Sequence, residues 1–263
     1  MDIGIVGNVS RDTVWLGDKK IGPFVGGAGF NVAIAVARSG IRPRLISTIG
    51  IDNRGLLNEI DQLVDTSSLA VLEGKTCAFE IRYSEEGTFK DIQCLFGVSK
   101  SLNEHVRNIA LGQMHHHICC RKPLDPEPIL ARLYLKGCSF SLDFIVSSVV
   151  ESVTRCQRWI PYAECVFVNS AEFAVLREHC DLNKIKLLVI TAANKPVTIF
   201  RYGEQVCEYP CPPCEVYEVT GAGDTLAGTF LAQHLIKKQP LDVSIAKAVA
   251  SAQSILGRPG VWN

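Results

Sequence analysis

Short apolar runs alternate along most of the chain with segments in which apolar residues recur every three or four positions. The runs predict buried strands, at 1–9, 42–50, 114–120, 138–144, 164–169 and 186–193. The segments between them predict amphipathic helices, at 30–40, 53–64, 126–135, 148–158, 171–178, 221–235 and 241–256. This alternation predicts an α/β fold in three layers, with a mostly parallel central sheet and helices on both of its faces.

Two other stretches show the period of two that is typical of antiparallel strands. They span residues 13–25 and 69–98, and each contains a polar turn. We expect them to pair as a small β lid on a single domain that covers residues 1–263, since the chain shows no repeat or linker. Exposed sheet edges can pair between subunits, so a homodimer through the lid is plausible, and the sequence does not decide it.

Composition limits the classes of partner. The 263 residues are 47% hydrophobic, and 27 basic residues balance 27 acidic ones. A neutral chain offers no electrostatic reason to bind nucleic acid or an anionic membrane. The N-terminus lacks the features of a signal peptide, and no apolar run is long enough to span a bilayer. We therefore expect a cytoplasmic protein whose 11 cysteines are reduced thiols.

The segment 219–232 carries the strongest chemical signal. Gly221, Ala222 and Gly223 precede a helical pattern, and small residues allow a ligand to approach the backbone. The unpaired N–H groups and the dipole at a helix start form an anion site. Asp224 would ordinarily be a helix cap there. A carboxylate beside bound phosphate can instead accept the proton of an attacking hydroxyl.

This segment resembles the second signature of the ribokinase-like carbohydrate kinases, also called the PfkB family, which is Asp-Thr-x-Gly-Ala-Gly-Asp. The resemblance implies that Gly221, Ala222 and Gly223 form the anion hole and that Asp224 is the catalytic base. The chain departs from the signature at Glu218 and Val219. The family's Asp at the first of these positions belongs to a monovalent-cation loop, so activation by potassium is left open.

A first signature of the family, a Gly-Gly pair followed by Asn, is matched by Gly26, Gly27 and Asn31. The resemblance implies that these residues bind hydroxyl groups of the substrate. Asp12 matches the family's acid beyond the first strand, which typically holds two sugar hydroxyls. Taken without the resemblance, Asp12 is more typical of a turn, and Gly-Gly before a helix is usually only a turn as well.

A third match predicts the nucleotide site. Asn169 and Glu172 correspond to an Asn-x-x-Glu motif that helps to place Mg²⁺ and the nucleotide phosphates, largely through water, in the family. An N-terminal helix cap is the alternative. Thr191 matches a nucleotide-contacting residue, although the turn after it, residues 192–196, has lost the family's glycines.

The resemblance covers essentially the whole chain and implies a ribokinase-like enzyme. It would transfer the γ-phosphoryl group of ATP, with Mg²⁺, to a hydroxyl of a sugar or sugar derivative. The layout and the closing residues 260–262 are most similar to fructosamine-type kinases such as fructoselysine 6-kinase. A nucleoside kinase is the alternative, with Trp15, Phe24 and Phe79 as candidates to stack on a base. A second alternative is a sugar- or nucleotide-binding protein on the same fold without catalytic activity.

Other patterns favour structural roles. Consecutive histidines on a strand, His115 to His117, cannot all face one metal ion, although one of them could line the substrate cleft. The Cys-Pro-Pro-Cys stretch at 211–214 lacks the strand-to-helix context of a redox motif. The sequence contains neither a P-loop nor a Rossmann fingerprint.

Overall fold

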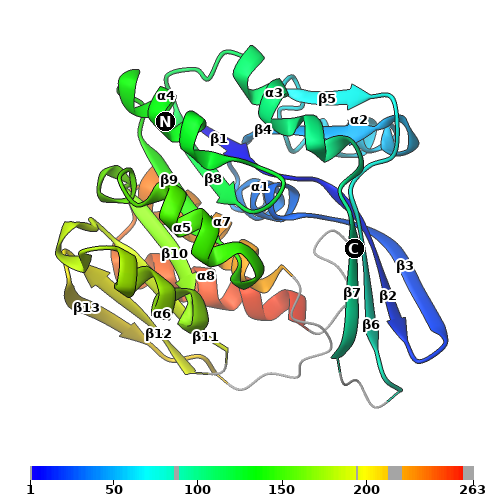
Figure 1. Cartoon of the computed structure of the whole chain (residues 1–263). Coiled ribbons are helices and arrows are strands. Elements are labelled where there is room, and N and C mark those ends of the chain that lie inside the picture. Colours follow the sequence, from blue (N-terminus) through cyan, green and yellow to red (C-terminus); the bar gives the residue numbers. More distant parts are fainter. Residues whose placement is uncertain (1, 86–88, 194, 213–220, 257–263) are drawn as a thin grey trace.

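The six strands predicted from apolar runs belong to a nine-stranded sheet between two layers of helices (Figure 1). The structure is a computed structural model, and it describes residues 2–85, 89–193, 195–212 and 221–256. The sheet has the order β13-β12-β11-β10-β9-β8-β1-β4-β5. Its strands are β1 (Ile3–Val6), β4 (Arg44–Gly50), β5 (Leu69–Leu72), β8 (His115–Cys120), β9 (Phe140–Phe144), β10 (Cys165–Asn169), β11 (Leu188–Ala192), β12 (Lys195–Arg201) and β13 (Glu204–Tyr209).

Neighbouring strands from β5 to β11 are parallel, and β12 and β13 continue the sheet in antiparallel pairing. The carboxyl ends of parallel strands share one edge of a sheet, where α/β proteins usually bind ligands. The predicted fold class is therefore confirmed, including its mostly parallel sheet.

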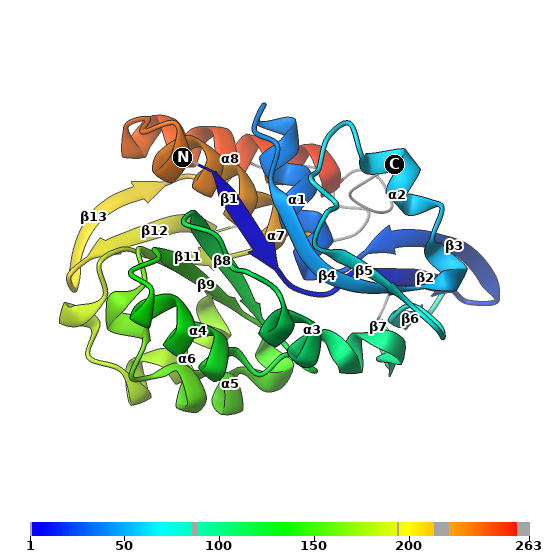
Figure 2. The same cartoon turned by 90° about the horizontal axis from the view of Figure 1, so that it is seen from above.

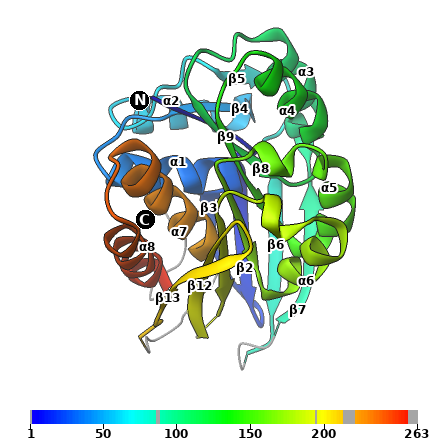
Figure 3. The same ribbon diagram turned by 90° about the vertical axis from the view of Figure 1, so that its left-hand side faces the viewer.

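Successive residues of each central strand enter different cores, because strand side chains alternate between faces. Ile5 packs in one buried cluster and Val6 in the other, and Cys119 and Cys120 divide in the same way. Figures 2 and 3 show α1, α7 and α8 on one face and α4, α5 and α6 on the other. The helices are α1 (Ala28–Arg38), α2 (Leu56–Ile60), α3 (Leu102–Asn108), α4 (Pro126–Leu135), α5 (Val149–Cys156), α6 (Ser170–His179), α7 (Ala222–Phe230) and α8 (Leu241–Leu256).

A second, four-stranded sheet projects from the large one (Figure 1). Its order is β3-β2-β6-β7, from β2 (Ser10–Leu16), β3 (Lys19–Gly26), β6 (Ala78–Tyr83) and β7 (Phe89–Leu95). The lid range predicted from residue 69 was wrong at its start, because Leu69–Leu72 pairs in parallel with β4 at the edge of the large sheet. A lid function and a dimer through these strands stay predictions.

Two helices differ from the sequence pattern. The helix predicted over 53–64 forms only between Leu56 and Ile60, and α3 was not predicted. Only Leu102 and Val106 of α3 are buried, so its apolar signal is too short to recognise. None of the helices that the structure describes combines the length and the apolar character needed to cross a membrane.

Candidate active site

Helices α1 and α7 pack closely enough to join residues that are far apart in the sequence. The contact depends on Gly228, because a Cβ there would lie 2.6 Å from the Val32 carbonyl oxygen and 2.8 Å from the Ala35 Cβ. The close approach places Asn31 of α1 beside Asp224 of α7, so the two predicted signatures meet at one point.

Asp224 lies in the first turn of α7 and is 4% exposed. The Nδ2 of Asn31 donates to its Oδ2 at 3.0 Å, and the Nη2 of Arg121 donates to its Oδ1 at 2.5 Å. The cap position belongs to Gly221, and no side chain caps the helix. The ordinary capping role is therefore excluded for Asp224, whose carboxylate bonds side chains of two other elements.

Arg121 and Asp143 complete the charged centre and were missed by sequence reasoning. Arg121 follows β8, and its Nη2 also donates to Asp143 Oδ2 on β9 at 3.0 Å. Burial opposes ionisation of Asp143, but the adjacent Arg121 and His117 hold the pKa of its carboxyl below the ordinary value. The available signal was their position, since both lie at the carboxyl ends of predicted strands.

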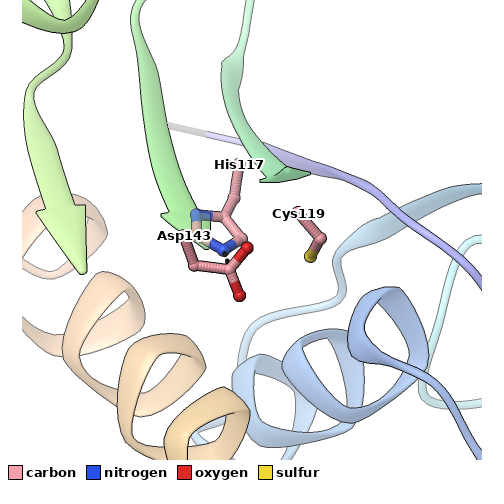
Figure 4. Close-up of side chains that lie close together, drawn as sticks. All are labelled: His117, Cys119 and Asp143. Atoms are coloured by element: carbon pink, nitrogen blue, oxygen red, sulfur yellow. Dashed lines mark ion pairs between the residues drawn. The ribbon is translucent and has the colours of Figure 1, made fainter. Parts of the chain in front are cut away.

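Figure 4 shows His117, Cys119 and Asp143 close together. Their potential ligand atoms lie within 4.8 Å of one another, and all three residues are buried. The Nδ1 of His117 faces Ser141 Oγ at 2.9 Å, and its Nε2 lies 3.9 Å from Asp143 Oδ2. The Arg121 guanidinium already balances Asp143 and would repel a divalent cation. We therefore assign this cluster a structural role.

The predicted substrate residues lie close to one another and reach Asp224 through Asn31. The side chain of Asp12 on β2 lies against Gly26, where a Cβ would collide with the Asp12 Oδ2. Gly27 begins α1 with a φ of 95°, and its carbonyl accepts from the Asn31 N–H at 2.9 Å. Asn31 Oδ1 is buried without a hydrogen-bond partner among the described residues. The structure thus brings together all four predicted substrate residues.

The predicted nucleotide residues lie at the ends of β10 and β11. Asn169 and Thr191 are register partners across these strands. Asn169 and Glu172 form a capping box at the start of α6, in which the Asn169 N–H and Nδ2 each donate to a Glu172 carboxylate oxygen at 2.8 Å. The capping alternative is therefore correct for both residues, and it leaves the nucleotide role open.

Burial raises the pKa of Glu172 to about 7, and the nearby charge of Asp143 adds to the rise while Arg121 opposes it. Asp143 on β9 and Arg121 after β8 thus both influence the ionisation of Glu172. The nucleotide residues are therefore electrostatically coupled to the Asp224 centre.

At the centre of the predicted anion hole, Gly223 is not covered by the described residues. Gly221 adopts a left-handed conformation with φ 81°, and its carbonyl accepts the first bond of α7, from Thr225 N–H at 2.8 Å. Gly223 is exposed, and a Cβ there would meet no atom of the described residues within 4 Å. The N–H groups of this turn can therefore be approached by a ligand. Other residues named in the sequence analysis lie outside the described residues: 194, 213, 214, 218–220 and 260–262.

Residues 17–263 match the family described as pfkB family carbohydrate kinase. The chain belongs to this family. The kinase is 28% identical over 281 residues to a cytidine kinase of Thermococcus kodakarensis, with 100% of this chain and 99% of the relative covered.

Two solved structures share the fold of this PfkB-family kinase. A nucleoside kinase of Methanocaldococcus jannaschii superimposes with a TM-score of 0.80 at 21% identity, covering 99% of this chain and 93% of that one. A provisionally named ribokinase II of E. coli, in complex with ATP and Mg²⁺, superimposes with a TM-score of 0.82 at 18% identity, covering 99% and 94%. These similarities confirm the ribokinase-like fold that the two signatures predicted.

Proposed function

We propose that this kinase transfers the γ-phosphoryl group of ATP to a ribose hydroxyl of a nucleoside. The observation that carries the proposal is the buried Asp224 carboxylate, fixed by Asn31 and Arg121 next to the open N-terminal turn of α7. In this arrangement Asp224 accepts the proton of the acceptor hydroxyl, and the amides of residues 221–223 stabilise negative charge on the phosphoryl group.

The acceptor is placed by the surface from Asp12 to Asn31. A carboxylate accepts hydrogen bonds from two hydroxyl groups, which suits a vicinal diol such as the one in ribose. The unpartnered Asn31 Oδ1 among the described residues provides a further acceptor for a hydroxyl. Asn31 thus touches the acceptor with one end of its amide and the proposed base with the other.

A nucleoside is favoured over a free sugar by one feature of the lid and by one relative. Phe24 lies directly opposite Asp12 in the β2–β3 ladder, and opposed residues share a face of a sheet. An aromatic ring beside the sugar-binding acid suits a base attached to that sugar. Trp15 is less suited, because Arg82 and Lys20 lie over its ring at 4.9 and 5.6 Å.

The full-length similarity to a cytidine kinase supports the same acceptor class. The sugar acceptor and the fructosamine-type likeness expected from the sequence stay predictions.

The nucleotide is ATP with Mg²⁺ in this proposal, as in the complex of the E. coli relative. Each Glu172 oxygen accepts one bond from Asn169 and keeps further lone pairs. The pair therefore fits Mg²⁺ held through water, which suits an ion that retains several waters. The bound ion would neutralise charge on the phosphates, and Thr191 would contact the nucleotide beside Asn169.

An acceptor screen tests the proposed function. The enzyme is incubated with ATP and Mg²⁺ and with cytidine, other nucleosides, ribose or fructosamines, and the products are identified by mass spectrometry. We expect a nucleoside monophosphate as the main product. Phosphorylation of sugars alone would overturn the nucleoside assignment, and ligand binding without any phosphorylated product would indicate a binding protein.

The Asp224→Asn substitution tests the assigned base. We expect turnover to fall by about 10²–10⁴-fold, the usual contribution of a general base, while calorimetry shows little change in ATP affinity. Asp242→Asn is the matched control, since Asp242 is an exposed acid in the first turn of α8. Turnover of Asp224→Asn at the wild-type rate would remove Asp224 from the mechanism.

A further inference from the structure

Arg121 lies at the point of the large sheet where the strand order reverses, between β1 and β8. From β1 the sheet continues through β4 to β5 on one side, and from β8 through β9 and β10 to β11 on the other. Ligands of open α/β sheets bind in the crevice above such a switch point. Arg121 directly follows β8 and therefore lies between the acceptor residues near β1 and the nucleotide residues after β10 and β11.

The crevice is rich in acidic groups, although a nucleotide brings negative phosphates into it. Asp143 and Asp224 are each 4% exposed, and Glu172 is 5% exposed. Burial strengthens repulsion between such groups and an incoming phosphate. Arg121 is bonded to both aspartates, which places its positive charge at the centre of the proposed reaction.

The Arg121 guanidinium has N–H groups that make no hydrogen bond to the described residues. A single nitrogen, Nη2, makes both hydrogen bonds that Arg121 donates to the described residues. The Nε is buried and has no partner among those residues, and the side chain as a whole is 22% exposed. A planar guanidinium offers five N–H donors in a fork that matches phosphate oxygens. The remaining donors can therefore bind a second anion without loss of the Asp224 contact.

We propose that Arg121 is a catalytic residue that binds the transferring phosphoryl group. This inference rests on the proposed function. In the step, the acceptor oxygen forms a bond to the γ-phosphorus, and the bond from that phosphorus to the bridging oxygen breaks, with its electron pair leaving on ADP. The hydroxyl proton passes to Asp224. Arg121 stays protonated throughout and donates to non-bridging oxygens, on which negative charge is spread in the transition state.

The test compares Arg121→Gln with Arg121→Lys. We expect kcat of the Gln variant to fall by about 10²–10³-fold, as when one preorganised donor is lost, and the Kd of ATP to rise, because the buried carboxylates then repel the phosphates without a balancing cation. The Lys variant keeps the charge but not the fork, so an intermediate loss is expected. Lys122→Gln is the matched control, because Lys122 is the adjacent exposed cation and pairs with Glu151; its kcat should equal that of wild type.

Removing Arg121 leaves two buried carboxylates without their cation, which can prevent folding. The double variant Arg121→Gln/Asp143→Asn removes one charge of each sign. If Arg121 contacts the phosphoryl group, the folded double variant stays as slow as the single variant, and its affinity for ADP with aluminium fluoride and acceptor falls by a similar factor. Recovery of wild-type kcat in the double variant would overturn the inference, because neutralising Asp143 would then be the only role of Arg121.

Failure of the proposed function and failure of the role assigned to Arg121 would give different results. If the wild-type enzyme phosphorylates no acceptor, the proposed function is wrong. If the wild-type enzyme is active and Arg121→Gln turns over equally fast, only the role of Arg121 is wrong.

Discussion

At the scale of single residues, Asn31 is the residue that would link the acceptor to the base in the proposed function. Its Nδ2 donates to Asp224 Oδ2 at 3.0 Å, which leaves its Oδ1 directed elsewhere. A hydrogen bond to a charged partner contributes about 1.5–3 kcal/mol. Asn31 thus both holds the base and recognises substrate in the proposed function, so its loss should affect two kinetic constants.

We expect Asn31→Ala to lower kcat by roughly 10–100-fold, the equivalent of that hydrogen bond, and to raise KM for the acceptor. The Kd of ATP should not change, because Asn31 lies on the acceptor side. Steady-state kinetics with varied acceptor, combined with calorimetry of ATP, measures all three. Asn58→Ala on the exposed surface of α2 is the control. An unchanged KM for the acceptor would contradict a contact between Asn31 and substrate.

Asn31 and Asp224 could be predicted because each belongs to a compact local motif. Arg121 and Asp143 could not, since neither has a motif around it. Their meeting depends on strand register, in which Cys119 lies beside Asp143, and on the packing of α7 over the sheet. The sequence predicted both strands, but nothing in it fixed which residues at their ends would meet Asp224.

At the scale of elements, residues that cap the start of a helix can also contribute to a binding site. The α6 capping box uses both carboxylate oxygens of Glu172, so local pattern alone could not separate a cap from a nucleotide contact. The lid range shows a similar ambiguity. Leu69–Leu72 adjoins the alternating stretch that forms β6 and β7, and only its parallel pairing with β4 assigns it to the large sheet.

The burial of Glu172 should make stability depend on pH. The pKa of Glu172 is raised from 4.5 to about 7 by burial, so between these values the folded state binds a proton that the unfolded state releases. The contribution is fully present below about pH 4.5 and is lost as pH rises through about 7. It amounts to roughly 3 kcal/mol at most.

Urea unfolding of the wild type and of Glu172→Gln at several pH values between 4.5 and 8 measures this contribution. Gln preserves the capping geometry but does not titrate. We expect the free energy of unfolding of the wild type, relative to the variant, to decrease with rising pH over this range. A difference that is independent of pH would show that folding does not raise the pKa of Glu172.

At the scale of the whole molecule, two buried hydrophobic clusters pack on the two faces of the large sheet. The smaller, four-stranded sheet lies beside it. The lid strands β2, β3, β6 and β7 have few buried residues compared with the central strands. Ile92 and Leu95 of β7 are 50% and 65% exposed. Segments with few buried contacts open at lower free energy than the core. Among the described elements, we therefore expect these four strands to move more readily than the central sheet when ligands bind.

Asp12 and Phe24 would connect the small sheet to the proposed acceptor site, because β2 carries Asp12 and β3 carries Phe24 as register partners. We expect the acceptor nucleoside to slow hydrogen exchange in β2, β3 and β6 more than ATP alone does, whereas β9 and β10, already buried, should not change. Exchange measured by mass spectrometry on the free enzyme, with ATP analogue, with nucleoside and with both distinguishes these cases. Equal protection by the ATP analogue alone would place the nucleotide, and not the acceptor, under the lid. Closure driven by the acceptor would exclude water from the crevice only when a hydroxyl is present to receive the phosphoryl group.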